Sequence, residues 1–209
     1  MSVTRYQFIE KILRDVYGDM PNDDSVITFN LVNIWLSEGI GLAARKNATD
    51  NIQLEGVSFV NNSFYSSFKG LSITNDSTFL YKVLLPEVPI GIGKNEGVAS
   101  LKFINGSQKS PDAVPLSANQ VTYVDGMRLI PNKVLYWSEG DFLYIKSITD
   151  ITPYKANIRL ISGGDSSNLD STLNVPPDYL PLITDYIVKN LMMSRSGQND
   201  KINDGVDSK

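Results

Sequence analysis

The spacing of apolar residues changes twice along the chain, and this change constrains the fold more than any other feature of the sequence. Near the N-terminus the apolar residues recur at helical spacing, at Phe8, Ile9, Ile12, Leu13 and Val16. Between residues 52 and 161 short runs of Val, Ile, Phe and Tyr are separated by Gly, Asn, Asp and Pro, which is typical of strands and turns. Helical spacing returns after residue 175. The sequence therefore predicts an α+β fold with a β region inserted between helical ends.

The first predicted helix has a recognisable start and stop. Thr4 and Gln7 have the spacing of a capping box, in which each side chain binds the backbone N–H of the other residue. Gly18 suits the left-handed residue that ends many helices. A turn is expected at residues 20–23, where the sequence reads Met-Pro-Asn-Asp.

A second helix is predicted from about Val26 to Arg45, with Asp24 or Ser25 as its cap. Its buried stripe would comprise Ile27, Leu31, Ile34, Trp35, Ala43 and Ala44. Gly39 and Gly41 interrupt this pattern, and each costs a helix about 1 kcal/mol relative to Ala. They predict either a short break in the helix or the close approach of a neighbouring element.

The middle of the chain predicts an antiparallel sandwich or a small barrel, because short strands alternate with turn residues. The best hairpin turn is Glu139-Gly140-Asp141, which has an apolar run on each side. The predicted strands are Gln53–Val60, Thr78–Leu85, Gly97–Ile104, Gln120–Val124, Lys133–Ser138, Phe142–Ile148 and Asn157–Ile161.

A polar linker at 162–170 precedes the last predicted helix, which begins at Val175-Pro-Pro-Asp178 because proline is favourable in a first helical turn. The apolar stripe of this helix comprises Tyr179, Leu182, Ile183, Tyr186, Ile187, Asn190 and Leu191. We expect it to pack on the N-terminal helices, since a lone amphipathic helix is marginal in water.

The predicted organisation has four parts. Residues 1–50 form a helical pair, 51–163 the β domain, and 164–195 the linker with the C-terminal helix. The polar residues 196–209 are either disordered or an extended arm that becomes ordered on a partner.

The composition narrows the possible chemistry. The 209 residues include no cysteine and no histidine. Disulfides and thiolate sites are therefore excluded, and the commonest general acid–base and zinc ligand are missing. A Ser–Lys site or a pair of carboxylates remains chemically possible. We predict that the chain is not an enzyme and has no cofactor, no metal site and no catalytic residue.

The charged residues do not predict binding to nucleic acid or to a membrane. The net charge is −4, and the basic residues are scattered singly along the chain. No apolar stretch has the length of a signal peptide core or of a membrane span. We expect a soluble protein that is made in a cytoplasm.

Two polar segments resemble binding loops only in part. Gly91-Ile-Gly93-Lys94-Asn-Glu-Gly97 has neither dinucleotide-fingerprint nor Walker spacing, and its place between strands favours an exposed hairpin loop. Asp165, Asn168 and Asp170 offer oxygen ligands for calcium, but their spacing matches no EF-hand and favours a solvated linker.

Three further groups of residues carry alternative chemistry. A glycosidase needs two carboxylates at a suitable separation, and two of the scattered glutamates could meet in this way. The candidates are Glu38, Glu55, Glu87, Glu96 and Glu139. Ser66 and Lys69 have Ser-x-x-Lys spacing but lie in a segment that resembles a strand. Two clusters of aromatic residues could bind sugar, although packing is the commoner use of such side chains. One cluster comprises Phe59, Phe64, Tyr65 and Phe68, and the other comprises Tyr136, Trp137, Phe142 and Tyr144.

Both helical ends resemble the neck and tail-ring proteins of tailed bacteriophages. One end carries Thr4-Arg-Tyr-Gln-Phe-Ile-Glu-Lys-Ile-Leu-Arg14 before a second long helix. The other carries Val175-Pro-Pro-Asp-Tyr-Leu-Pro-Leu-Ile-Thr-Asp-Tyr-Ile-Val-Lys-Asn-Leu191, like the terminal helix of head-to-tail adaptors, and is expected to end near Lys201-Ile-Asn-Asp204. The Asn-rich composition without Cys or His is similar to that of structural proteins of crAss-like podoviruses. The β region carries no part of the resemblance.

The resemblance implies a structural virion protein of the neck or tail. Such a protein forms a homo-oligomeric ring of about twelve copies, closed by heterologous contacts. It docks beneath the portal protein, contacts other neck and tail rings, and lines the channel through which genomic DNA passes without specific binding. The alternatives are a carbohydrate-binding β module of a receptor-binding tail protein, and an enzyme with a carboxylate pair.

Overall fold

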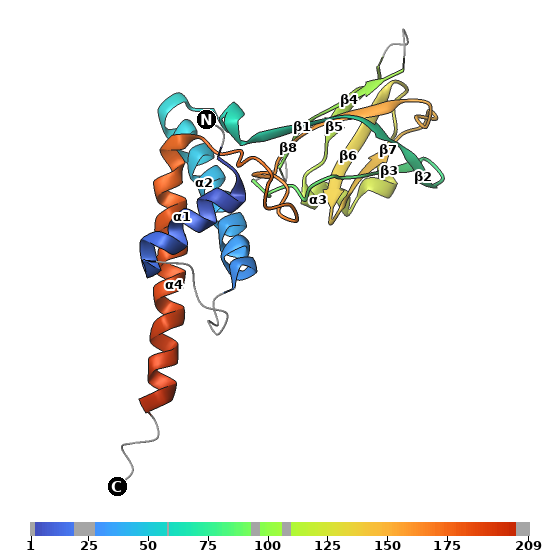
Figure 1. The fold of residues 1–209 in the computed structure, drawn as a ribbon. Coiled ribbons are helices and arrows are strands. Elements are labelled where there is room, and N and C mark those ends of the chain that lie inside the picture. The colour runs from blue at the N-terminus through green and yellow to red at the C-terminus, as the bar shows by residue number, and fades with distance from the viewer. Residues whose placement is uncertain (1–2, 19–27, 58, 93–96, 106–109, 204–209) are drawn as a thin grey trace.

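The chain folds into a helical bundle and a β arm that meet at an elbow (Figure 1). The computed structural model describes residues 3–18, 28–57, 59–92, 97–105 and 110–203. Helices from both chain ends form the bundle, and the segment between them forms the arm. This confirms the predicted α+β class with an inserted β region.

Helix α1 (Arg5–Tyr17) begins and ends as predicted. The Thr4 hydroxyl accepts a hydrogen bond from the Gln7 N–H at 3.2 Å, and the Gln7 amide oxygen accepts one from the Thr4 N–H at 3.1 Å. Gly18 adopts a left-handed conformation with φ 75°, and its N–H donates to the Arg14 carbonyl. The capping box and the glycine stop are confirmed, while the turn predicted at 20–23 lies outside the described residues.

Helix α2 (Phe29–Glu55) is continuous through both of its glycines and is longer than predicted. Thr28 is its N-cap, and Gly56 (φ 72°) ends it. The predicted end at Arg45 and the predicted strand Gln53–Val60 are therefore wrong. The helix continues because its buried stripe does: Asn47 and Ala48 are both buried. The proposed caps Asp24 and Ser25 lie outside the described residues.

The glycines of α2 allow a close approach and do not break the helix. A Cβ atom at Gly39 would lie 3.1 Å from Ile183 Cγ2 in helix α4 (Leu180–Asn203). Together α1, α2 and α4 enclose one apolar core. Its fully buried members include Ile9, Leu13, Leu36, Ile40, Phe64, Ile183, Ile187 and Leu191. Among the described residues, no helix is both long and apolar enough to span a membrane.

Helix α4 begins later than predicted, and it ends beyond the predicted apolar stripe, within the range of residues 201–204 that the resemblance implies. A short 3₁₀ turn at Pro177–Tyr179 precedes it, so the regular helix begins at Leu180. It continues past Arg195 to Asn203, which makes residues 196–203 helical where a disordered or extended tail was predicted. Residues 204–209 lie outside the described part of the chain.

The β arm consists of two sheets that share one core. The first has the strand order β1 (Tyr65–Ser72), β8 (Lys155–Ile161), β4 (Val98–Ile104). The second runs β2 (Thr74–Ser77), β3 (Leu80–Leu84), β7 (Phe142–Lys146), β6 (Lys133–Glu139), β5 (Asp112–Pro115). All pairs are antiparallel except β5 and β6, which are parallel. The arrangement is compatible with a sandwich, and the described strands do not close into a barrel.

The strand predictions succeed where strands are apolar and fail elsewhere. The predicted segments at β3, β4, β6, β7 and β8 are confirmed with small shifts in their ends, and so is the hairpin turn at Gly140, where φ is 57°. Gln120–Val124 is not a strand: Ala118–Val121 forms one helical turn, α3, and Val124–Gly126 a 3₁₀ turn. Strands β1, β2 and β5 were not predicted, because polar and exposed residues dominate them.

Candidate functional site

The elbow is built around a buried arginine. Arg5 has no exposed surface, and its Nε donates to Asn33 Oδ1 of α2 at 3.0 Å. One terminal nitrogen donates to the Gly163 carbonyl beyond β8 at 3.2 Å, and the other to Ser37 Oγ at 2.5 Å. Burial lowers the pKa of the Arg5 guanidinium below its ordinary value, and the nearby carboxylates of Glu87 and Asp165 oppose that shift. This one side chain ties α1, α2 and the end of the β arm together.

Two adjacent glycines beyond β8 allow close contacts at the same place, one with α2 and one with the backbone of Thr172. Gly163 has φ 69°, and a Cβ there would lie 2.6 Å from Ile40 Cγ2. Gly164 has φ 96°, and a Cβ there would lie 2.6 Å from the Thr172 carbonyl oxygen. Both positions therefore require glycine, for conformation and for space.

A cleft of about 480 Å³ opens beside this joint. Its lining includes Ser37 of α2, Glu87 from the segment after β3, Asp141 of the β6–β7 turn, and Asp165. Glu87 Oε2 is shielded from solvent and has no hydrogen-bond partner among the described residues. We call this the elbow cleft. Its carboxylates give it an acidic character.

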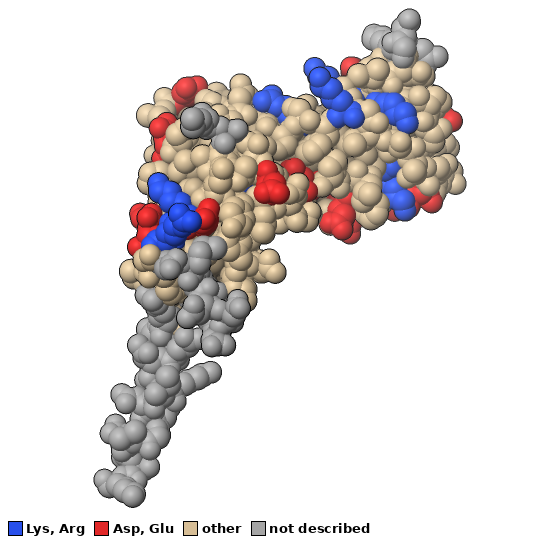
Figure 2. All heavy atoms as spheres, in the orientation of Figure 1, with Lys and Arg blue, Asp and Glu red and all other residues tan. Residues whose placement is uncertain are grey.

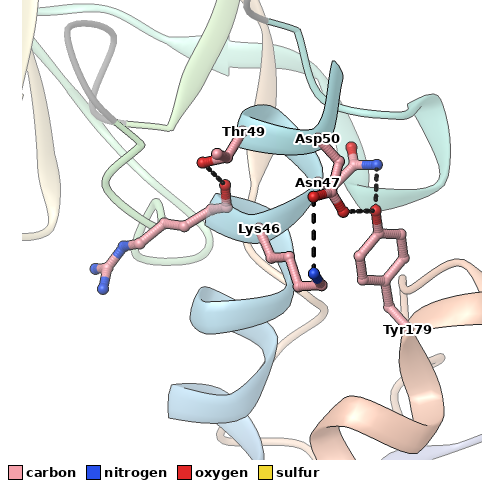
Figure 3. Close-up of polar contacts among 6 residues, drawn as sticks. Lys46, Asn47, Thr49, Asp50 and Tyr179 are labelled. Atoms are coloured by element: carbon pink, nitrogen blue, oxygen red, sulfur yellow. Dashed lines mark hydrogen bonds and ion pairs between the residues drawn. The ribbon is translucent and has the colours of Figure 1, made fainter. Parts of the chain in front are cut away.

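A polar cluster fixes the far end of α2 to α4 (Figure 3). The Asn47 amide donates to the Tyr179 hydroxyl at 3.0 Å, and that hydroxyl donates to Asp50 Oδ2 at 3.2 Å. Asn47 Oδ1 accepts from the Asn61 N–H at 2.8 Å, and Lys46 lies 3.7 Å from Asp50 Oδ1. The cluster satisfies its own polar groups across three segments, which is the pattern of a structural clamp.

The two segments that resemble binding loops only in part have structural roles in the described residues. Gly97 has φ 81°, and a Cβ there would lie 2.2 Å from the Ile90 carbonyl oxygen, so it permits a close backbone contact. Residues 93–96 of that loop lie outside the described part. Asp165 Oδ1 accepts from the Ser167 N–H and hydroxyl at 2.9 and 2.6 Å, and Asn168 Oδ1 accepts from the Asp170 N–H. These side chains cap turns.

The candidate catalytic groups are not brought together. Glu38 accepts a hydrogen bond from Tyr186, while Glu55 ends α2 and Glu139 ends β6. Of the candidate glutamates, only Glu87 lines the elbow cleft, and Glu96 lies outside the described residues. No group of three or more acidic side chains in the described part of the chain is arranged to hold a metal ion.

The Ser-x-x-Lys candidate is divided between two faces of a strand. Ser66 is buried, where its hydroxyl accepts from the Asn174 amide at 2.7 Å, whereas Lys69 is exposed. Side chains three apart along a strand point to opposite faces.

The aromatic clusters pack mainly inside the molecule. Trp137 is 8% exposed and stacks on Tyr144 with ring centroids 5.7 Å apart. Tyr136 and Phe64 are buried, and Phe64 meets Tyr179 edge-on. Most of the ring surface that a sugar platform would present is therefore used in packing.

The structure adds a basic surface that the linear sequence does not reveal. The three strands β1, β8 and β4 contain Lys69, Lys102, Lys155 and Arg159, and they contain no acidic residue. We call their outward side the basic face. These basic residues lie far apart in sequence and come together only through strand pairing. The alternation of side chains along each strand could have predicted that each residue is exposed, but not that the residues are neighbours.

Comparison with known proteins identifies no relative. No protein-family profile matches the chain, and a search of curated proteins finds no match.

Proposed function

We propose that the chain is a structural virion protein of a tailed bacteriophage, without catalytic activity. Copies of it form a closed ring of about twelve in the neck or tail, joined by heterologous contacts. The ring docks beneath the portal, connects it to the other rings of the tail machinery, and surrounds the genome exit channel.

The observation that carries this proposal is the length of α4. Leu191 is the last buried residue among the α4 side chains that the structure describes, and the backbone helix continues to Asn203, beyond both α1 and α2 (Figure 1). Just after Leu191, the apolar Met192 is 59% exposed. A helical segment that packs on nothing is marginal in water. A neighbouring subunit or ring would supply the missing contact.

The bundle offers a further apolar surface beyond its core. Several apolar side chains of α2 are exposed, at Ile34, Leu42 and Ile52, and Leu54 near its end is 82% exposed. Single exposed apolar residues are ordinary, but several on one helix agree with a protein partner. This agrees with a subunit that is covered on several sides.

The resemblance at both chain ends supports the same role. The segments that resemble head-to-tail adaptors form α1 and α4, and these helices pack together with α2 in one bundle. The lack of His and Cys agrees with a role that depends on surfaces.

The proposal is tested on particles of the virus that encodes this chain. Purified virions should contain the chain, and quantitative mass spectrometry should find about twelve copies of it per particle if the ring is twelve-fold. Immunogold label should lie at the head–tail junction or on the tail. An antibody against the major capsid protein is the matched control. A chain that is abundant in infected cells but missing from purified particles would contradict the proposal.

A further inference from the structure

We infer that copies of this chain bind one another by placing the basic face of one copy against the elbow cleft of the next. The inference rests on the proposed ring and names the two surfaces that would close it.

The basic face brings four positively charged side chains together on a chain whose net charge is −4. Lys69, Lys102 and Lys155 are exposed, and Arg159 lies between them in the central strand β8. Ser67 and Ser100 both pair with Arg159 across the sheet, so they lie on the same side as its guanidinium. None of the four basic residues forms a salt bridge with a described residue. Their charges are therefore available to a partner.

The elbow cleft supplies the opposite charge. It brings Glu87, Asp141 and Asp165 together, and Glu87 Oε2 lacks a hydrogen-bond donor. Arg5 lies close enough to interact electrostatically with two of these carboxylates, but its guanidinium hydrogen-bonds to Asn33, Ser37 and Gly163. A lysine from outside could pair with the exposed Asp141 and with the accessible part of the Glu87 carboxylate, and the attraction between opposite charges favours such a contact.

The rim of the cleft is apolar. Leu84 and Val88 both line the cleft and are exposed. On the basic face, Ile104 is likewise exposed beside the charges, since it pairs with Lys155. Apolar side chains beside complementary charges are typical of protein–protein contacts.

The two surfaces are different parts of the same chain. In Figure 2, most of the basic side chains seen on the β arm lie along its upper edge, whereas more of the acidic ones lie below that edge and at the elbow than on it. A heterologous contact joins two different patches of the same chain, and repeating it about an axis closes a ring. Patches on opposite sides of one arm allow this repetition without obstructing each other.

A second copy fits the basic face better than a nucleic acid does. The Arg159 guanidinium covers one face of the Tyr65 ring, 4.4 Å from its centroid. That face of the ring is therefore not free to stack on a base. The acidic cleft, in contrast, would repel a phosphate backbone and attract this face.

The test reverses each surface separately. One variant carries Lys69→Glu and Lys102→Glu, and the other carries Glu87→Lys and Asp141→Lys. Each has like charges across the proposed contact, so we expect the self-association constant of each to fall about a hundredfold. An equimolar mixture of the two should associate again, because each copy then meets a complementary neighbour. Sedimentation velocity of the full chain at low ionic strength measures all three samples.

A matched control separates the contact from net charge. Arg128→Glu with Lys133→Glu makes the same change in net charge as the first variant, at exposed positions outside the basic face. We expect this control to associate like the wild type. Thermal melting of every variant identifies loss of fold.

Cysteine cross-linking tests the same contact when association is weak. The natural chain has no cysteine, so Ser67→Cys on the basic face and Ser166→Cys at the cleft introduce the sole thiols. A mixture of these two variants should form a disulfide-linked heterodimer on mild oxidation. Replacing Ser67→Cys by Thr78→Cys, in the exposed β2–β3 turn, should slow the reaction at least tenfold.

The outcomes separate this inference from the proposed function. If rings form and neither reversal weakens them, the ring uses other surfaces and the inference is wrong, while the virion role is unaffected. If the first variant instead loses affinity for a short duplex DNA and still self-associates, the basic face is a nucleic-acid surface and the inference is also wrong. A chain missing from virions contradicts the proposed function whatever the cross-linking shows.

Discussion

The bundle and the β arm are stabilised in different ways. The arm is one uninterrupted stretch of chain with an apolar core between its sheets, at Val83, Leu143, Ile145, Ile158 and Leu160 among others. The bundle is assembled from the two ends of the chain, and its core is joined by polar anchors at Arg5 and Asn47. Helix α4 packs on α1 and α2 although the whole arm separates it from them in sequence.

This difference makes the elbow the place where the two regions depend on each other. Backbone hydrogen bonds join the N-terminus to the segment after the arm, from the Leu173 N–H to the Val3 carbonyl and from the Arg5 N–H to the Ser171 carbonyl. Changes at the elbow should therefore lower the stability of both regions. Trp35 in α2 and Trp137 in β6 report on the bundle and the arm separately, since the chain has two tryptophans.

The largest expected effect is that of Gly163→Ala. The left-handed conformation costs about 1–2 kcal/mol for a residue with a Cβ, and the overlap with Ile40 costs about 1–3 kcal/mol more. In urea unfolding, the free energy of unfolding should fall by about 3 kcal/mol, whether it is followed by the fluorescence of Trp35 or of Trp137. Gly126→Ala, where an added Cβ meets nothing within 4 Å, is the control. A loss seen only at Trp35 would show that the arm is independent of the elbow.

Arg5→Met should have a slightly smaller effect. It removes the charge-assisted hydrogen bonds to Asn33, Ser37 and Gly163, and it leaves those groups buried without a donor. We expect the free energy of unfolding to fall by about 2–3 kcal/mol. Arg14→Met on the same helix, where the side chain is 63% exposed, should change it by under about 0.5 kcal/mol. Equal effects of the two substitutions would contradict the anchor role of Arg5.

Tyr179→Phe tests the clamp at the opposite end of α2. The substitution keeps the ring against Phe64 but removes the hydroxyl that Asn47 and Asp50 share. We expect the free energy of unfolding, measured by the fluorescence of Trp35, to fall by about 1 kcal/mol. Tyr123→Phe, at an exposed ring in the arm, should be neutral. If Trp137 registered the Tyr179 change as strongly as Trp35 did, the clamp would not be local to the bundle.

The smallest expected effect is on acid stability. Hydrogen bonds from the Ser167 hydroxyl and N–H lower the pKa of Asp165 below its ordinary 3.8. A carboxyl with a lowered folded-state pKa stabilises the fold above its unfolded value, and that contribution is lost as the pH falls through the folded value. The melting temperature of Asp165→Asn should therefore fall less than that of the wild type below pH 3.8. An identical acid profile for the two proteins would contradict this role.

Local patterns predicted the elements that local forces determine. The Thr4–Gln7 capping box and the Gly140 hairpin turn involve neighbouring residues, and both are confirmed. The end of α2 was placed too early because Asn47 looks unsuited to a buried helix position. It is buried because Tyr179 and Asn61, which are distant in sequence, satisfy its amide.

The missed strands and the two charged surfaces depend on long-range pairing. Strand β2 is wholly exposed and lacks the alternation that identifies a strand, yet it pairs with β3 as an edge. The basic face exists because β1 and β4 both pair with β8, and the elbow cleft exists because residues from four distant segments converge. Nothing in the spacing of these residues along the chain indicates that they meet.

A cryo-electron microscopy reconstruction of the head–tail junction tests the central claim most directly. The account predicts a symmetric ring into which the bundle and the arm both fit, with α4 in contact with a neighbouring subunit or ring along the part that extends beyond α1 and α2. A junction whose rings are fully accounted for by other chains, or density in which that part of α4 touches only solvent, would contradict it.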